Sequence, residues 1–346
     1  MRIGIISPLE MRVPPVAYGG TELIVSLLTE EYVKRGHDVT LFASGDSVTQ
    51  ARLVSICSHC LRGSDRDKAI LNMLNAVSCI ERADQFDIIH NNTQLEGMSI
   101  ARLVKTPMLT TLHGNLNGDL LLLFNHYTGW YNTISLSAKS LLPEKERFAG
   151  VIYNAIDVDA FPFDGSRTKS YLLFLSRISH EKGPHLAIEV AKKVGMRLII
   201  AGNVDKTDEQ YFRKEILPKI DGDQIKYVGE ADFNQKIELM LGAYCLLAPI
   251  AWPEPFGLFM VEAMACGAPV IVLNQGSAPE VVRHRETGFV VNNLTEMADA
   301  VEKIDDIDRA ECRKHVKQRF DAPRMAEDYL RTYERIMAES MSVISR

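Results

Sequence analysis

One stretch in the C-terminal half of the chain decides the fold: residues 248–267, which read APIAWPEPFGLFMVEAMACG. The apolar run over residues 245–248 predicts a buried strand. Prolines and a glycine then delimit a tight loop, and from Gly257 onward apolar residues recur at helical spacing. A strand, a loop and a helix N-terminus in this order present free backbone N–H groups and a positive dipole end to an anion.

The same stretch carries two glutamates, Glu254 in the loop and Glu262 in the second turn of the helix. A carboxylate in that turn interacts only weakly with the helix dipole, so we interpret it as an acceptor of hydrogen bonds from hydroxyl groups. Sugars and ribose carry such hydroxyls. The simpler alternative is a pair of solvated glutamates beside a core helix, and only the flanking sequence argues against it.

Length and composition are those of an ordinary soluble protein with two domains. The 346 residues exceed what one hydrophobic core usually serves, and the net charge of −6 argues against a broad nucleic-acid surface. Cys57 and Cys60 are spaced like half a zinc site, but no second pair follows, so all six cysteines are interpreted as reduced thiols. The chain opens on a strand without a leader and has no apolar run near the roughly 20 residues of a membrane span. We therefore expect a cytoplasmic protein without stable membrane insertion.

The N-terminal half alternates predicted strands and helices. Apolar runs predict strands, and amphipathic stretches predict helices, in a βαβα order that indicates a parallel sheet covered on both faces. In open α/β sheets ligands bind beyond the carboxyl ends of the strands, so the loops there are the candidate sites. The predicted strands are residues 3–7, 39–43, 88–90, 108–112 and 131–135, and the predicted helices are residues 21–35, 66–85, 98–104 and 137–142.

Three of these loops carry candidate residues. The first, residues 8–20, ends in Gly19 and Gly20, which let the backbone approach an anion closely before a helix. It lacks the Gly-x-Gly-x-x-Gly pattern, which argues against a dehydrogenase. His113 follows the strand at 108–112 and is placed to reach a cleft between domains, although an isolated histidine is more often structural. Asn91 and Asn92 follow another strand, either as acceptor contacts or as turn residues.

The second half repeats the alternation and adds a pair of cations. Arg177 and Lys182 share the loop after its first strand, and an arginine fork with a lysine point charge suits a diphosphate, although solvated charges are the default interpretation. The last helix has one apolar face, interpreted as core packing: Met325, Tyr329, Tyr333 and Ile336. The predicted strands are residues 171–175, 197–201, 225–228, 245–248 and 270–273, and the closing helices are residues 308–319 and 322–337.

Together these motifs resemble the retaining glycosyltransferases of family 4. The resemblance rests on the sequence around Glu254 and Glu262, on the Arg-x4-Lys-Gly pattern at residues 177–183, and on Asn154-Ala155-Ile156-Asp157, where Ala155 replaces the usual glycine and would stiffen a hinge. It covers nearly the whole chain and is densest over residues 171–291. It implies the GT-B fold, an α/β architecture of two Rossmann-like domains facing across a cleft.

The resemblance also implies the domain boundaries. We expect an acceptor-binding domain at residues 1–155, a linker at 156–170 and a nucleotide-sugar-binding domain at 171–321. The helix at 322–346 is expected to return to the first domain.

The resemblance assigns a role to each candidate side chain. Glu254 would bind the hydroxyls of the donor sugar and Glu262 the ribose, while His113 would contact the sugar and steady developing positive charge through its backbone. Arg177 and Lys182 would neutralise the leaving diphosphate, so that no divalent metal is expected. Backbone contacts to the donor are implied at Gly19, Gly20, Gly202, Val228, Phe256, Gly257 and Leu258, and in second rank at Gly276-Ser277-Ala278-Pro279-Glu280.

The activity implied is transfer of a hexose from a nucleoside-diphosphate sugar to a hydroxyl acceptor, with retained anomeric configuration. A UDP-sugar is expected first and GDP-mannose next. The acceptor would be a soluble sugar, glycan or small molecule, bound by residues 8–20, 91–96 and 115–119. No motif supplies a carboxylate nucleophile, so Glu254 is assigned to binding and orientation.

Other functions stay open at this point. The alternatives are a GT-B nucleotide-sugar epimerase, a phosphorylase with pyridoxal phosphate, and a non-catalytic nucleotide-sugar-binding protein. A non-catalytic protein is expected to have lost some of the site residues, but this chain keeps all four of Arg177, Lys182, Glu254 and Glu262.

Overall fold

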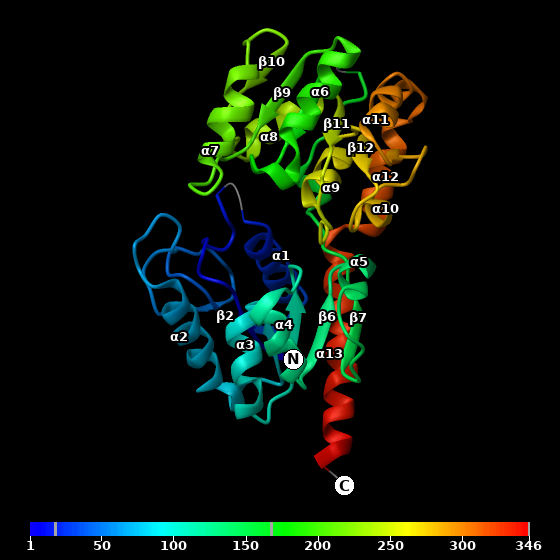
Figure 1. Cartoon of the computed structure of the whole chain (residues 1–346). Helices are drawn as coiled ribbons and strands as arrows, with labels where there is room; N and C mark the ends of the chain where they lie inside the picture. Colours follow the sequence, from blue (N-terminus) through cyan, green and yellow to red (C-terminus); the bar gives the residue numbers. More distant parts are fainter. Residues whose placement is uncertain (17–18, 167–168, 345–346) are drawn as a thin grey trace. The chain divides into compact units, whose positions relative to one another are not determined.

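The structure is a computed structural model that describes residues 1–16, 19–166 and 169–344. The chain divides into two compact units: an N-terminal unit of Met1–Asn154 with Ala322–Arg346, and a C-terminal unit of Ala155–Asp321. Figure 1 labels their helices and some of their strands. Ala17 and Tyr18, in the predicted first loop, and Arg167 and Thr168, in the predicted linker, lie outside the described residues.

The N-terminal unit is built on a parallel sheet of seven described strands in the order β3-β2-β1-β4-β5-β6-β7. Consecutive residues such as Ile5 and Ile6 are both fully buried, so both faces of the sheet are covered. Its strands are β1 (Arg2–Ile6), β2 (Asp38–Phe42), β3 (Arg52–Val54), β4 (Ile88–Asn91), β5 (Met108–Leu112), β6 (Trp130–Thr133) and β7 (Phe148–Val151). Its helices are α1 (Gly20–Lys34), α2 (Lys68–Ile80), α3 (Gln94–Ile100), α4 (Gly118–His126), α5 (Leu136–Ser140) and α13 (Ala322–Ile344).

Several sequence predictions in this unit were wrong in detail. The helix predicted at 66–85 stops at Ile80 and is followed by a separate turn, Ala83–Gln85. The edge strands β3 and β7 were missed, because they are short and half exposed and so carry no continuous apolar run. The two segments predicted to bind the acceptor are partly helix or strand: Asn91 ends β4, residues 94–96 belong to α3, and residues 118–119 open α4.

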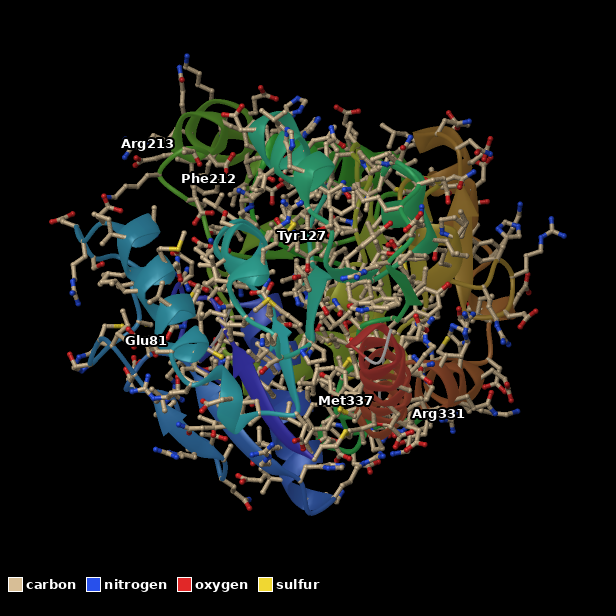
Figure 2. All side chains as sticks on the ribbon, turned by 90° about the horizontal axis from the view of Figure 1, so that it is seen from below. Glu81, Tyr127, Phe212, Arg213, Arg331 and Met337 are labelled. Atoms are coloured by element: carbon tan, nitrogen blue, oxygen red, sulfur yellow. The ribbon has the colours of Figure 1, made fainter. Side chains whose placement is uncertain are left out.

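The last helix, drawn in red in Figure 1, belongs to the N-terminal unit and packs against α1. Its predicted apolar face is confirmed, since Met325, Tyr329, Tyr333 and Ile336 are fully buried. The helix continues beyond the predicted end at residue 337 as far as Ile344. Figure 2 labels Arg331 and Met337 on this helix, and the side chain of Arg331 is 70% exposed.

The C-terminal unit has a second parallel sheet, with six described strands in the order β10-β9-β8-β11-β12-β13. The predicted bounds of β8 and β12 are confirmed, whereas β13 was missed. Its strands are β8 (Tyr171–Leu175), β9 (Leu198–Ala201), β10 (Ile225–Tyr227), β11 (Ala243–Ala248), β12 (Val270–Leu273) and β13 (Gly288–Val291). Its helices are α6 (Pro184–Val194), α7 (Glu209–Tyr211), α8 (Phe233–Gly242), α9 (Leu258–Ala265), α10 (Ala278–Val281), α11 (Leu294–Val301) and α12 (Arg309–Arg319).

The segment expected to be a linker begins within the C-terminal unit. Val158 and Phe161 are buried, and Arg313 of α12 donates hydrogen bonds to the carbonyl oxygens of both residues. Ala155, the residue expected to stiffen a hinge, is fully buried and is the first residue of this unit. Over residues 1–16, 19–166 and 169–344, no helix is both long enough and apolar enough to cross a bilayer.

Candidate active site

The topology of the C-terminal sheet points to one region. The strand order reverses between β8 and β11. In open α/β sheets ligands bind at such a switch point, beyond the carboxyl ends of the strands. The loop after β8 carries Arg177 and Lys182, and the loop after β11 carries Glu254. These three sequence candidates therefore lie at the switch point of one sheet.

Two close backbone contacts bring these loops together. The backbone N–H of Ala251 donates to the carbonyl oxygen of Glu181 at 2.9 Å. Gly183 has φ +75°, and a Cβ atom on it would lie 2.3 Å from the carbonyl oxygen of Pro249. Only glycine allows this approach without strain, so the residue after Lys182 sets how near the cation comes to the Glu254 loop.

The Glu254 carboxylate is held at one of its two oxygens. Its Oε2 accepts hydrogen bonds from the Lys182 ammonium and from the Trp252 indole N–H, the latter at 2.9 Å. The Lys182 Nζ also lies 5.2 Å from the centre of the Trp252 ring, within the range of a cation–π contact. Within the described part of the chain, Oε1 has no hydrogen-bond partner. Glu254 Oε1 can therefore accept a hydrogen bond from a ligand hydroxyl without breaking the ion pair to Lys182.

A third loop, which follows β12, contacts the loop that carries Glu254. Ser277 donates from its backbone N–H to the carbonyl oxygen of Glu254 and from its hydroxyl to that of Phe256, both at 2.9 Å. Gly276 has φ +56°, and a Cβ on it would lie 2.3 Å from the Glu254 nitrogen. Gly276 and Ser277, which the resemblance gave as donor contacts of second rank, thus fix the position of the loop that carries Glu254.

Helix α9 presents its N-terminus directly after that loop. Gly257 is its N-cap residue, Leu258 is its first residue, and no described side chain caps it with a hydrogen bond. Phe256 is buried against Phe320, which anchors the preceding turn. An uncapped N-terminus with no acidic residue in its first turn is suited to bind an anion.

Arg177 is surrounded by carboxylates. Its guanidinium is bonded to Glu181 and lies 3.3 Å from Asp208 and 3.6 Å from Asp205. Burial is the main reason that the pKa of Asp208 is raised, while the charge of Arg177 opposes that shift. The segment after Asp208 runs through α7 to Phe212 and Arg213, which are labelled in Figure 2. A diphosphate at Arg177 would compete with these carboxylates for the guanidinium.

Glu262 has an ionic partner that the sequence did not indicate. The Nζ of Lys236, on α8, lies 2.8 Å from Glu262 Oε1, and the two side chains are 17% and 6% exposed. Oε2 of Glu262 has no hydrogen-bond partner among the described residues. This pair repeats the arrangement at Glu254, with one oxygen held and the other available.

The residues expected near the base lie at the ends of β9 and β10. The Gly202 N–H donates to the carbonyl oxygen of Gly229 at 2.8 Å, and the Tyr227 hydroxyl donates to that of Gly202 at 2.8 Å. Val228 is 42% exposed. These contacts tie the end of β9 to the end of β10 mainly through backbone groups of Gly202 and Gly229.

In the N-terminal unit the strand order reverses between β1 and β4, and His113 lies near that point. Its Nε2 donates to Asn92 Oδ1 at 2.9 Å, and Asn92 in turn donates from its backbone and side chain to the carbonyl oxygen of Ile6. Burial lowers the pKa of His113 to about 4, so the imidazole is neutral at pH 7. Its Nδ1 is buried and has no partner in the described residues.

Gly19 and Gly20 also belong to the N-terminal unit, as the N-cap and the first residue of α1. Two residues further on, Glu22 is buried and accepts a hydrogen bond from the backbone N–H of Met11 at 3.3 Å. Burial raises the pKa of Glu22 to about 7. The first loop is therefore tied to α1 through a carboxyl group that titrates near neutrality.

Sequence reasoning missed two side chains of this site, Trp252 and Lys236. Trp252 lies inside the decisive stretch, two residues before Glu254, and its indole N–H was a signal that could have been used. Lys236 lies on α8 outside every motif, so nothing in its local sequence marks it. Among the described residues, no group of three His, Cys, Asp or Glu side chains is arranged to hold a metal ion.

Comparisons with known proteins assign the family. Residues 159–319 match the model described as "Glycosyl transferases group 1", and residues 18–160 match that described as "Glycosyltransferase Family 4". A putative glycosyltransferase of Bacillus subtilis, YtcC, is 24% identical over 344 residues, covering 88% of this chain and 83% of the relative.

Two solved structures share the fold. Sucrose-phosphate synthase from Thermosynechococcus elongatus superposes with a TM-score of 0.81 at 19% identity, over 98% of this chain and 99% of the other. HepE of Anabaena, solved in complex with UDP and glucose, gives a TM-score of 0.75 at 19% identity over 96% and 99%. The chain belongs to glycosyltransferase family 4, has the GT-B fold and is a glycosyltransferase.

Proposed function

We propose that the protein transfers a hexose from a UDP-sugar to a hydroxyl acceptor, with retention of anomeric configuration and without a divalent metal. The observation that carries this proposal is the assembly at the β8–β11 switch point. There Lys182 and Glu254 form an ion pair beside the uncapped N-terminus of α9. A cation and free amides suit a diphosphate, and a carboxylate with one unpaired oxygen suits the hydroxyls of the sugar attached to it.

In the proposed reaction the bond between the anomeric carbon and the diphosphate breaks, and its electron pair leaves with the phosphate oxygen. Lys182, Arg177 and the α9 amides stabilise that developing charge. The acceptor oxygen forms its bond on the same face of the sugar, and the leaving phosphate takes the acceptor proton. Glu254 is assigned to orienting the sugar and not to nucleophilic attack, because its Oε2 accepts hydrogen bonds from Lys182 and Trp252. His113 belongs to the N-terminal unit, and its lowered pKa makes its imidazole neutral at pH 7. We assign it to contact with the donor sugar.

The choice of UDP has support from one similar structure, since HepE was solved with UDP and glucose. We assign Glu262 to the ribose, and Gly202 and Val228 to the base. The N-terminal unit would bind the acceptor, a soluble sugar, glycan or small molecule.

The first test is a calorimetric titration of the full chain with UDP, GDP and ADP in the presence of a chelator. We expect UDP to bind most tightly and EDTA to leave its affinity unchanged. If GDP binds best, the donor assignment changes. If no nucleoside diphosphate binds to the folded protein, the proposed function fails.

The second test removes the principal cation. Lys182→Ala should lower the transfer rate by on the order of 10²–10³-fold, the scale seen when one preorganised stabilising group of a transition state is lost. Lys193→Ala, at an exposed position of α6, is the control and should be unaffected. A folded Lys182→Ala enzyme with normal activity would refute the role of Lys182. NMR of the product's anomeric proton tests retention.

A further inference from the structure

The ion pair between Lys236 and Glu262 needs an explanation beyond the motifs of the family. Helix α8 begins with a capping box formed by Asp232 and Gln235, which fixes the start of the helix and holds Lys236 in its first turn. The lysine reaches α9 and bonds to Glu262, which is 5% exposed. A buried pair of this kind is weak evidence for stability alone, because desolvation offsets much of the attraction.

The chemistry of the two groups suggests what they recognise. An ammonium has three N–H donors, and one of those on Lys236 is used on Glu262 Oε1. The remaining donors, together with the unpaired Oε2 of Glu262, offer a neighbouring donor and acceptor. A vicinal diol presents two hydroxyls, each able to donate and accept, and so matches this pair at both positions. When one of the two hydroxyls is missing, either the ammonium or the carboxylate loses its own hydroxyl partner.

We propose that Lys236 is a specificity-determining residue that, with Glu262, clamps the 2′- and 3′-hydroxyls of the donor's ribose. The pair then selects ribonucleotides over 2′-deoxyribonucleotides. This inference rests on the proposed function, in which Glu262 binds the ribose. Loss of the 2′-hydroxyl leaves a buried polar group unpaired, which is the situation in which binding sites discriminate most strongly.

The experiment compares UDP with 2′-deoxy-UDP by calorimetry on the wild-type chain and its variants. Wild type should prefer UDP by on the order of tenfold or more. Lys236→Met keeps the length of the side chain without its donors, and should bring the preference close to unity while weakening UDP. Lys236→Arg keeps donors and charge and should retain part of the preference. Lys193→Met is the matched control and should behave as wild type.

A second variant guards against misfolding, because Lys236→Met leaves Glu262 buried without a partner. Lys236→Met combined with Glu262→Gln removes that charge, and should also bind the two nucleotides about equally. If either folded variant keeps the wild-type preference, or loses affinity for both nucleotides by the same factor, the clamp is overturned while the proposed function stands. If wild type binds no nucleoside diphosphate, both fail together.

Discussion

At the residue scale, the two glutamates of residues 248–267 have the same arrangement of partners. Each carboxylate has one oxygen bonded to a lysine from another segment, Lys182 for Glu254 and Lys236 for Glu262. Each lysine offsets the cost of burying its carboxylate and leaves the second oxygen for a ligand.

Trp252 provides the first test of this arrangement. Trp252→Phe removes the indole N–H from Glu254 Oε2 but keeps an aromatic ring beside Lys182. Because hydrogen bonds to charged groups contribute about 1.5–3 kcal/mol, we expect kcat/KM for the nucleotide sugar to fall by roughly tenfold or more. The affinity for UDP alone should be unchanged, because UDP lacks the transferred hexose that Glu254 is proposed to orient. Equal losses for UDP and UDP-sugar would contradict the assignment of Glu254 to the sugar.

Arg177 provides the second test. If a diphosphate binds Arg177 as proposed, the neighbouring carboxylates compete with it for the guanidinium, so Asp208→Asn should tighten UDP binding. The pair is partly exposed, so the gain should be modest, about 1 kcal/mol or roughly fivefold. Asp223→Asn is the matched control, because Asp223 pairs with Arg197 on the surface. Weaker UDP binding in Asp208→Asn would show that the carboxylate positions Arg177 instead of competing for it.

At the element scale, helix α13 is joined to the N-terminal sheet by a buried chain of hydrogen bonds. The Tyr333 hydroxyl donates to His90 Nδ1 at 2.7 Å, and His90 Nε2 donates to Thr111, which donates to Asn132. Tyr329 completes the chain by bonding to Thr111 and Asn132. This order of donors requires a neutral imidazole, and burial lowers the pKa of His90 to about 3.

A pair of tyrosine variants tests that chain. Tyr333→Phe leaves His90 Nδ1 without its donor and should cost about 1–3 kcal/mol of unfolding free energy, measured by urea denaturation. Tyr131→Phe is the matched control, since the Tyr131 hydroxyl is buried in the same unit without a partner among the described residues. Its removal should be neutral or stabilising. Equal effects of the two substitutions would mean that the hydrogen bonds of α13 contribute nothing specific.

At the scale of the whole molecule, buried titratable groups make stability depend on pH in two opposing ways. The pKa values of His90 and His113 are lowered to about 3 and about 4, so their contribution is complete above the unfolded pKa near 6.5 and is lost as the pH falls toward these values. The pKa of Glu22 is raised to about 7, so its folded state favours the protonated form. That contribution is complete below the unfolded value of 4.5 and is lost as the pH rises through 7.

Glu22→Gln isolates the second effect, because the amide keeps an acceptor for the Met11 N–H but cannot ionise. We expect the variant to gain stability over wild type as the pH rises from 5 to 8, by about 2 kcal/mol across that range. Urea denaturation at four pH values measures this difference. A difference that does not change with pH would mean that Glu22 titrates normally in the folded protein.

The sequence by itself determined the α/β class, the family and most of the strands, because buried parallel strands are continuous apolar runs and the motifs around Glu254 and Lys182 are dense and local. It did not reveal α4 or the edge strands β3, β7 and β13, whose patterns are short or lack a clear period.

Tertiary structure alone decided which side chains meet. Lys236 lies 26 residues from Glu262 along the chain, and Gly276 supports Glu254 across a third loop. Such contacts come from the packing of α8 on α9 and from the order of strands in the sheet, which no local pattern encodes. The pKa values of His113 and Glu22 depend on burial for the same reason, since desolvation is set by atoms contributed from distant parts of the chain.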